Sequence, residues 1–153
     1  VRLATPADVD FLVFGNAEMA RETEHIALDP ARLRAGVRAL FDDPSRGLYF
    51  VAEIGGQPAG QMMITYEWSD WRNGAFWWIQ SVYVDPAWRR KGVYRRLHDT
   101  VVSIGKADSK ICGIRLYVAR DNRTAQTVYR RVGLAPSMYE VYEDDFVLRH
   151  HRL

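Results

Sequence analysis

The sequence predicts an α/β fold in which a mixed β-sheet carries helices on both faces. Apolar residues recur at helical spacing as far as Phe41, follow an extended pattern from Leu48 to Val84, and then alternate between the two periods. The resulting order of elements is β-α-α-β-β-β-α-β-α-β. Hairpin strands followed by alternating helices and strands favour a mixed sheet between two helical layers. No repeat or linker interrupts the chain, so we expect one domain over residues 1–153.

Turn and capping residues delimit the expected elements. Thr5 followed by Pro6 is typical of a helix start, and Asp29-Pro30 repeats that punctuation. Gly55-Gly56 indicates a hairpin turn, and the apolar run AFWWIQSVYV after Asn73-Gly74 is typical of a central strand. Two further helices are expected around residues 93–104 and 125–132, the second closed by Gly133. The expected strands are residues 1–3, 48–54, 59–66, 75–84 and 113–118, with one or two edge strands within 138–148.

Composition limits the classes of function. Twenty-one basic and nineteen acidic residues leave a net charge of +2, so any anion site must be local. The single cysteine, Cys112, begins an apolar run and is expected to be a buried, unreactive thiol. No apolar run approaches the roughly 18 residues of a membrane span, and no signal peptide is visible. We therefore expect a cytoplasmic protein with no membrane partner.

Positive charge gathers at one strand-to-helix junction, VYVDPAWRRKGVYRRL, residues 82–97. A nucleic-acid patch, a phosphate cradle and a solvated helix face are three interpretations of it. The unpaired N–H groups at a helix N-terminus favour anions, and Gly92 lets the backbone approach a ligand closely. Neither the Walker pattern nor G-x-G-x-x-G is present, so the usual nucleotide loops are not predicted.

The junction resembles the acyl-CoA signature of the GNAT superfamily of N-acetyltransferases, which is V-x-P followed by Q/R-x-x-G-x-G/A. Here these positions are Val84-Asp85-Pro86 and Arg89-Arg90-Lys91-Gly92-Val93-Tyr94. The family's second marker resembles Asn122-x-x-Ala125-x-x-x-Tyr129-x-x-x-Gly133-Leu134. The element order also matches, so the resemblance covers nearly the whole chain and implies a mixed sheet of about six or seven strands with about four helices. Tyr94 replaces a small residue of the signature; its ring either narrows the space beside the pyrophosphate or points outward.

The resemblance implies an acetyl-CoA site without a metal. The pyrophosphate would lie on the amides of residues 90–95, and the pantetheine arm would pair with the backbone at Val82 and Val84. Asn122 would lie beside the cofactor, and it is equally typical of a helix N-cap. The cofactor-binding residues that the resemblance implies are Val82, Tyr83, Val84, Arg89, Arg90, Lys91, Gly92, Val93, Tyr94, Arg95, Asn122, Ala125 and Tyr129.

The resemblance also implies a catalytic role for Tyr129. In the family, an amine attacks the thioester and the tetrahedral intermediate expels the CoA thiolate. A phenol remains protonated at neutral pH and can donate its proton to that leaving group. Helical spacing alone would favour a packing role for Tyr129, and the motif around it favours the general acid.

The sequence does not identify the general base. Some family members carry a glutamate on the central strand six residues before the valine of V-x-P, where this chain has Trp78. We expect Glu24 or Glu67 to act instead, with His25 a weaker alternative. Aromatic side chains close to acidic ones favour a cationic acceptor, such as a polyamine, an aminoglycoside or a lysine side chain. The residues expected to border the acceptor are Glu22, Glu24, Glu67, Asp70 and Trp78.

The sequence thus predicts an acyltransferase that moves the acetyl group of acetyl-CoA directly to a primary amine of a small molecule or peptide. One alternative is a GNAT-like protein that binds acyl-CoA without catalysis, which the missing strand glutamate and Tyr94 would fit. The other is a nucleic-acid-binding module, which the near-neutral net charge disfavours. We expect no nucleic-acid partner, and a homodimer is conceivable because family members are often dimers.

Overall fold

The computed structural model describes residues 1–148 and contains one mixed sheet of five strands in the order β1-β2-β3-β4-β5. Neighbouring strands are antiparallel except for β4 and β5, which are parallel. Val1–Ala119 and the chain from Arg120 onward form two compact units, and each is described by itself. The strands are β1 (Arg2–Leu3), β2 (Leu48–Ile54), β3 (Gln57–Ser69), β4 (Gly74–Val84) and β5 (Ile111–Arg115). The α-helices are α1 (Val9–Glu24), α2 (Pro30–Asp42), α3 (Val93–Ala107) and α4 (Arg123–Arg131).

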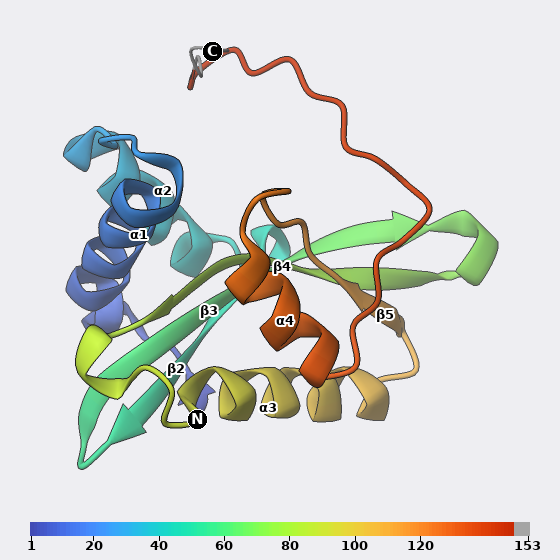
Figure 1. Ribbon diagram of the computed structural model, residues 1–153, viewed down its shortest axis with the longest axis horizontal. Coiled ribbons are helices and arrows are strands. Elements are labelled where there is room, and N and C mark those ends of the chain that lie inside the picture. The colour runs from blue at the N-terminus through green and yellow to red at the C-terminus, as the bar shows by residue number, and fades with distance from the viewer. Residues whose placement is uncertain (149–153) are drawn as a thin grey trace. The chain divides into compact units, whose positions relative to one another are not determined.

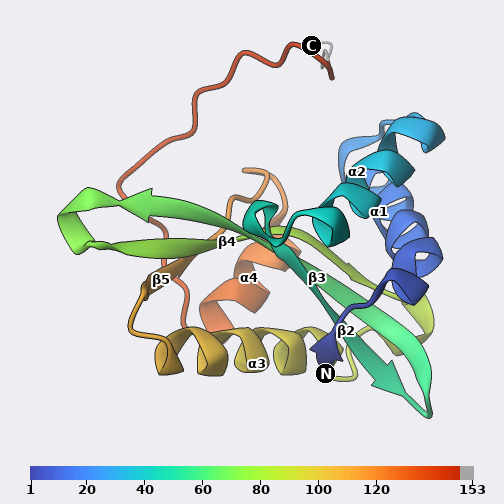
Figure 2. The same cartoon turned by 180° about the vertical axis from the view of Figure 1, so that it is seen from behind.

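Two apolar clusters hold the first unit together, one on each face of the sheet. Leu12 of α1 and Val37 of α2 pack with Val51 of β2 on one face. On the other face, α3 contributes Leu97 to a larger cluster that includes Ile64. Figures 1 and 2 show that the far end of the β3–β4 hairpin projects away from α1 and α2. These helices therefore leave the far end of the hairpin uncovered on their side of the sheet.

The α/β class and the order of the elements are confirmed, and two details of the prediction are wrong. The described residues form five strands, fewer than the six or seven expected, because no strand forms within residues 138–148. A strand requires a hydrogen-bonded neighbour, and this acidic segment has none in the structure. β5 is therefore an edge strand, and Cys112 on it is only half-buried, in contrast to the buried thiol expected.

The described helices lack the combination of length and hydropathy that a membrane crossing needs.

Capping side chains begin α2 and α4 where the sequence predicted, whereas the Thr5–Pro6 start leads into a short 3-10 helix (Pro6–Asp8) and α1 itself begins at Val9. Asp29 accepts a hydrogen bond from the Arg32 amide at 2.7 Å, which starts α2. Asn122 does the same for the Ala125 amide at 3.0 Å, which confirms its capping role at α4. Gly133 follows α4 with a left-handed φ of 92°, as a C-terminal glycine should.

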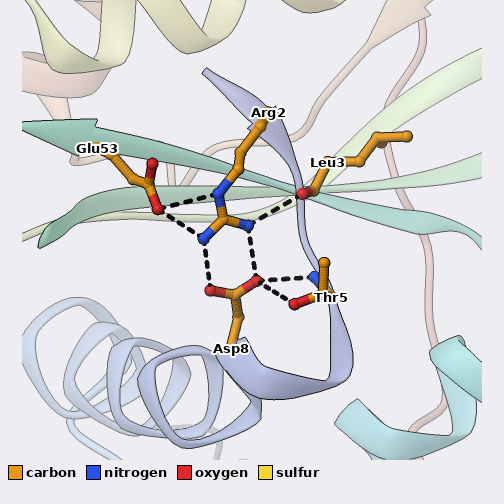
Figure 3. Close-up of polar contacts among 5 residues, drawn as sticks. All are labelled: Arg2, Leu3, Thr5, Asp8 and Glu53. Carbon is orange, nitrogen blue, oxygen red and sulfur yellow. Dashed lines mark hydrogen bonds and ion pairs between the residues drawn. The ribbon is translucent and has the colours of Figure 1, made fainter. Parts of the chain in front are cut away.

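A network centred on Arg2 anchors the N-terminus of the chain (Figure 3). The Arg2 guanidinium donates two hydrogen bonds to Asp8, at 2.8 and 2.9 Å, and two to Glu53 of β2, at 2.7 and 2.9 Å. Asp8 is buried, and its carboxylate also accepts from the Thr5 amide at 2.7 Å. The guanidinium of Arg2 is the largest influence lowering the pKa of Asp8, against the opposing effect of burial. These ion pairs thereby join β1 to β2 and to the start of α1.

We expect Arg2→Met to lower the free energy of unfolding by about 2 kcal/mol at neutral pH, because it leaves the Asp8 carboxylate buried without its cation. The pKa of Asp8 is depressed by folding, so this stability is complete above about pH 4 and is lost as the pH falls through the folded-state pKa. Denaturant unfolding at several pH values measures this contribution to the free energy of unfolding. Arg34→Met, which breaks only the exposed Arg34–Asp10 pair, is the matched control and should cost under about 0.5 kcal/mol. Equal losses of stability in the two variants would contradict the role of Arg2 in stabilising the buried Asp8 carboxylate.

Candidate active site

The central strand β4 has an open edge at its C-terminal half. Its pairing with β5 ends where Trp78 lies opposite Arg115, and no described strand continues the ladder. The Asp85 amide donates to Ala59 of β3 at 2.9 Å. By the alternation of an antiparallel ladder, Val82 and Val84 direct their backbone groups away from β3, toward this open edge. The sequence led us to expect ligand pairing at both Val82 and Val84; the Val82 backbone is placed for it, whereas the Val84 carbonyl already accepts from Arg89 at 2.9 Å.

A bulge interrupts β4 next to this edge. Met63 of β3 lies opposite Ser81 and Ile64 lies opposite Ile79, so Gln80 has no residue opposite it. Bulges bend a strand, redirect its side chains and are frequent beside active sites. Gln80 turns toward β3 and donates to the Thr65 hydroxyl at 2.9 Å.

The junction between β4 and α3 has the geometry of an anion cradle. Asp85 accepts from the Ala87 amide at 2.8 Å and turns the chain after β4. Gly92 is the N-cap of α3 with a left-handed φ of 83°, and no side chain caps the helix. A Cβ at Gly92 would meet no atom within 4 Å, so there is room beside the backbone at this position. The first amides of α3 and the positive end of its dipole together can hold a phosphate group.

The basic residues of the loop divide into two groups. Arg90, which has a left-handed φ of 61°, and Arg95 are exposed. Lys91 donates to the Ala87 carbonyl at 2.9 Å and lies 4.8 Å from the centre of the Trp88 ring. Arg89 is held more firmly, by an ion pair with Glu22. The loop thus presents exposed positive charge at its surface.

Arg89 binds Glu22 rather than standing as a separate charge. Its guanidinium donates to both Glu22 oxygens, at 2.8 and 3.1 Å, and to the Val84 carbonyl at 2.9 Å. The sequence placed Arg89 with the cofactor and Glu22 with the acceptor. The structure brings the two together as a bridge from the last turns of α1 to the end of β4.

Tyr94 packs inward. Its ring lies against the cluster beneath α3, 6.0 Å from the ring of His98, and Val93 beside it is buried. Of the two orientations left open by the sequence, the outward one is not adopted. The departure from the family signature is accommodated within the core of the first unit.

A polar and aromatic surface lies on the far half of the β3–β4 hairpin. It is on the same face of the sheet as α1 and α2, beyond the part that these helices cover. Glu67 accepts hydrogen bonds from the Trp78 indole N–H, at 2.8 Å, and from Arg115. Tyr117 donates to Gln80 at 3.0 Å, and its ring centre lies 5.7 Å from that of Trp78. We call this surface the hairpin platform and define it by Thr65, Glu67, Trp78, Gln80, Arg115 and Tyr117.

The structure brings together only some of the residues that were expected to border the acceptor. Glu67 and Trp78 are in direct contact. Asp70 is exposed in the turn η3 (Asp70–Arg72), where it accepts from the Trp71 amide at 2.8 Å. Glu24 is the last residue of α1, and His25 follows it with a left-handed φ of 56°. Sequence reasoning missed Arg115 and Tyr117, although their spacing of two residues on an expected strand would have placed them on one face.

In the second unit, α4 carries the residues of the second family marker. Asn122 caps the helix through Ala125, and Tyr129 follows one turn later on the same helix. Tyr129 is half-buried, and burial raises the pKa of its phenol. A higher pKa keeps the proton on the phenol throughout the neutral range, as a general acid requires.

No group of three or more His, Cys, Asp or Glu side chains within residues 1–148 is arranged to hold a metal ion.

Comparisons with known proteins agree with this geometry. The family model described as the acetyltransferase (GNAT) family matches residues 16–134. A possible acetyltransferase from Clostridium difficile 630 is 41% identical, with a TM-score of 0.90 over 96% of this chain and 97% of that one. An aminoglycoside N-acetyltransferase in complex with CoA shares the fold at 12% identity, with a TM-score of 0.77 over 95% of this chain and 93% of that one. The comparison with curated proteins gave no match. The chain belongs to the GNAT family of acetyltransferases.

Proposed function

We propose that this enzyme transfers the acetyl group of acetyl-CoA directly to a primary amine of a small molecule or peptide. The observation that supports this most is the junction of β4 and α3, where a left-handed glycine with room beside it precedes an uncapped helix N-terminus. That arrangement suits the pyrophosphate of CoA. Residues 1–153 would then act as one catalytic domain.

The cofactor roles are those that the family resemblance implies, and the contacts above support them. The amides of residues 90–95 cradle the pyrophosphate, and the exposed Arg90 and Arg95 supply charge around it. The backbone of Val82 pairs with the pantetheine arm at the open edge of β4. Asn122 and Ala125 border the cofactor while keeping the cap of α4.

The chemistry requires one acid and one base. The amine nitrogen forms a bond to the acetyl carbon, the carbon–sulfur bond breaks, and Tyr129 protonates the departing thiolate. The base accepts the proton that the amine must lose before it attacks. Both oxygens of Glu67 already accept hydrogen bonds from Trp78 and Arg115, which disfavours Glu67 as the base and leaves Glu24 of the two carboxylates expected from the sequence.

The test combines calorimetric titration of acetyl-CoA with thiol release in the presence of a panel of primary amines. Binding together with amine-dependent release of CoA is the expected result. Binding without turnover of any amine would favour the non-catalytic alternative. No binding at all would remove the basis of the proposal.

A further inference from the structure

Arg115 is the least expected residue of the hairpin platform. It lies on the edge strand β5, and its guanidinium carbon lies 3.6 Å from the centre of the buried Phe76 ring. The side chain is 30% exposed, so its charge is mostly shielded from water while one side stays accessible. A guanidinium so stacked on an aromatic ring is held in one plane.

Only part of the donor capacity of Arg115 is used. One terminal nitrogen donates to Glu67, and no other hydrogen bond of this side chain occurs in the described part of the chain. A guanidinium has five N–H donors. Its remaining donors form the fork that carboxylates bind with two parallel hydrogen bonds.

Glu67 serves to orient Arg115. Its second oxygen accepts from the Trp78 indole N–H at 2.8 Å, so the carboxylate is fixed from both sides. The lone pairs of Glu67 thereby face two donors of the protein itself. Glu67 is therefore less available as the acidic group that a cationic acceptor would need.

The rest of the platform is ordered and suits the chain of an acceptor. Tyr117 and Trp78 form its aromatic part, and the hydrogen bonds from Tyr117 to Gln80 and from Gln80 to Thr65 fix its floor. Trp78, opposite Arg115, lies four residues from Val82 along β4. At about 3.3 Å per residue this separates the two positions by roughly 13 Å, before the reach of the Arg115 side chain is considered.

We propose that Arg115 binds the carboxylate of the acceptor, so that the enzyme selects amines joined through an extended chain to a carboxylate. The inference rests on the proposed function and names its substrate class. Glu67 is a positioning residue in this scheme, and Arg115 determines specificity. Acceptors whose only charge is cationic would leave the remaining donors of the guanidinium unused and bring a second positive charge toward it.

The test compares ε-aminocaproate with its amide, which has the same length without the charge, and with the diamine cadaverine. The wild type should prefer the carboxylate over the amide by about ten- to a hundredfold in kcat/KM, the usual range for hydrogen bonds between charged groups. Arg115→Gln should bring the ratio to about one and leave acetyl-CoA affinity unchanged. Equal kcat/KM for carboxylate and amide in the wild type would overturn the inference.

A second variant separates specificity from folding. The double change Glu67→Arg with Arg115→Glu restores an ion pair of opposite orientation, and we expect its preference to shift to cadaverine. Restored activity with the preference unchanged would show that the pair is only structural and would overturn the inference. Thermal unfolding of each variant establishes that it is folded.

Equilibrium binding makes the result independent of turnover. Each amine is titrated into protein saturated with CoA, and the carboxylate should again bind more tightly than the amide. No difference between them would overturn the inference even if acetyl transfer occurs. Failure to bind CoA in the first place would instead refute the proposed function.

Discussion

Gly92→Glu should weaken acetyl-CoA binding by at least about a hundredfold, a loss of roughly 3 kcal/mol. Gly92 caps α3 with φ of 83°, and the space before it is where a phosphate would meet the first helical amides. A glutamate there brings a negative charge and a side chain against the pyrophosphate. Its charge is favourable to the α3 dipole, so the fold should be retained. Calorimetric titration of wild type and variant measures the change directly.

Gly56→Glu is the matched control for this prediction. Gly56 also has a left-handed φ, 76°, and a Cβ there would also meet no atom within 4 Å. Both substitutions therefore carry the same backbone strain, about 1 to 2 kcal/mol, and the same new charge. Gly56 lies in the turn between β2 and β3, so its variant should bind acetyl-CoA with nearly wild-type affinity. Similar losses in both variants, or none at Gly92, would argue against the cradle.

The turn after β4 and the start of α3 were predictable because their signals are local in sequence. Asp85 and Pro86 mark the turn after an apolar strand, and Gly92 marks the start of a helix whose spacing is plain. Each of these features acts over a few residues. The caps at Asp29 and Asn122 were predictable for the same reason, since an N-cap needs only its own side chain and an amide three residues later.

The acceptor side was less predictable because its contacts join residues far apart in sequence. Arg115 and Glu67 are 48 residues apart, and Arg89 and Glu22 are 67 apart. Charges on different elements pair only after the sheet register is set, and the register depends on the bulge at Gln80. The same limit explains the strands expected within residues 138–148, since alternation alone does not supply a neighbouring strand.

Tyr129→Phe should lower kcat by about a hundred- to ten-thousandfold, the usual contribution of a general acid. The substitution removes one oxygen and keeps the ring that packs α4, so acetyl-CoA affinity should change little. A fall in kcat with an unchanged Kd for acetyl-CoA separates the acid from a packing residue, because a packing role would affect stability before turnover. Tyr66→Phe is the control: burial also raises the pKa of that phenol, and we assign it no part in catalysis.

The pH profile tests the same role independently. Burial raises the pKa of Tyr129 above its ordinary value of about 10, so the phenol stays protonated between about pH 7 and 9 and should cause no loss of kcat there. Activity should decline only at higher pH, as the phenol loses its proton. Tyr129→Phe should lack this alkaline decline, since no proton remains to be lost. A wild-type profile that already falls near pH 8, with the same fall in Tyr129→Phe, would show that another group titrates and that Tyr129 is not the acid.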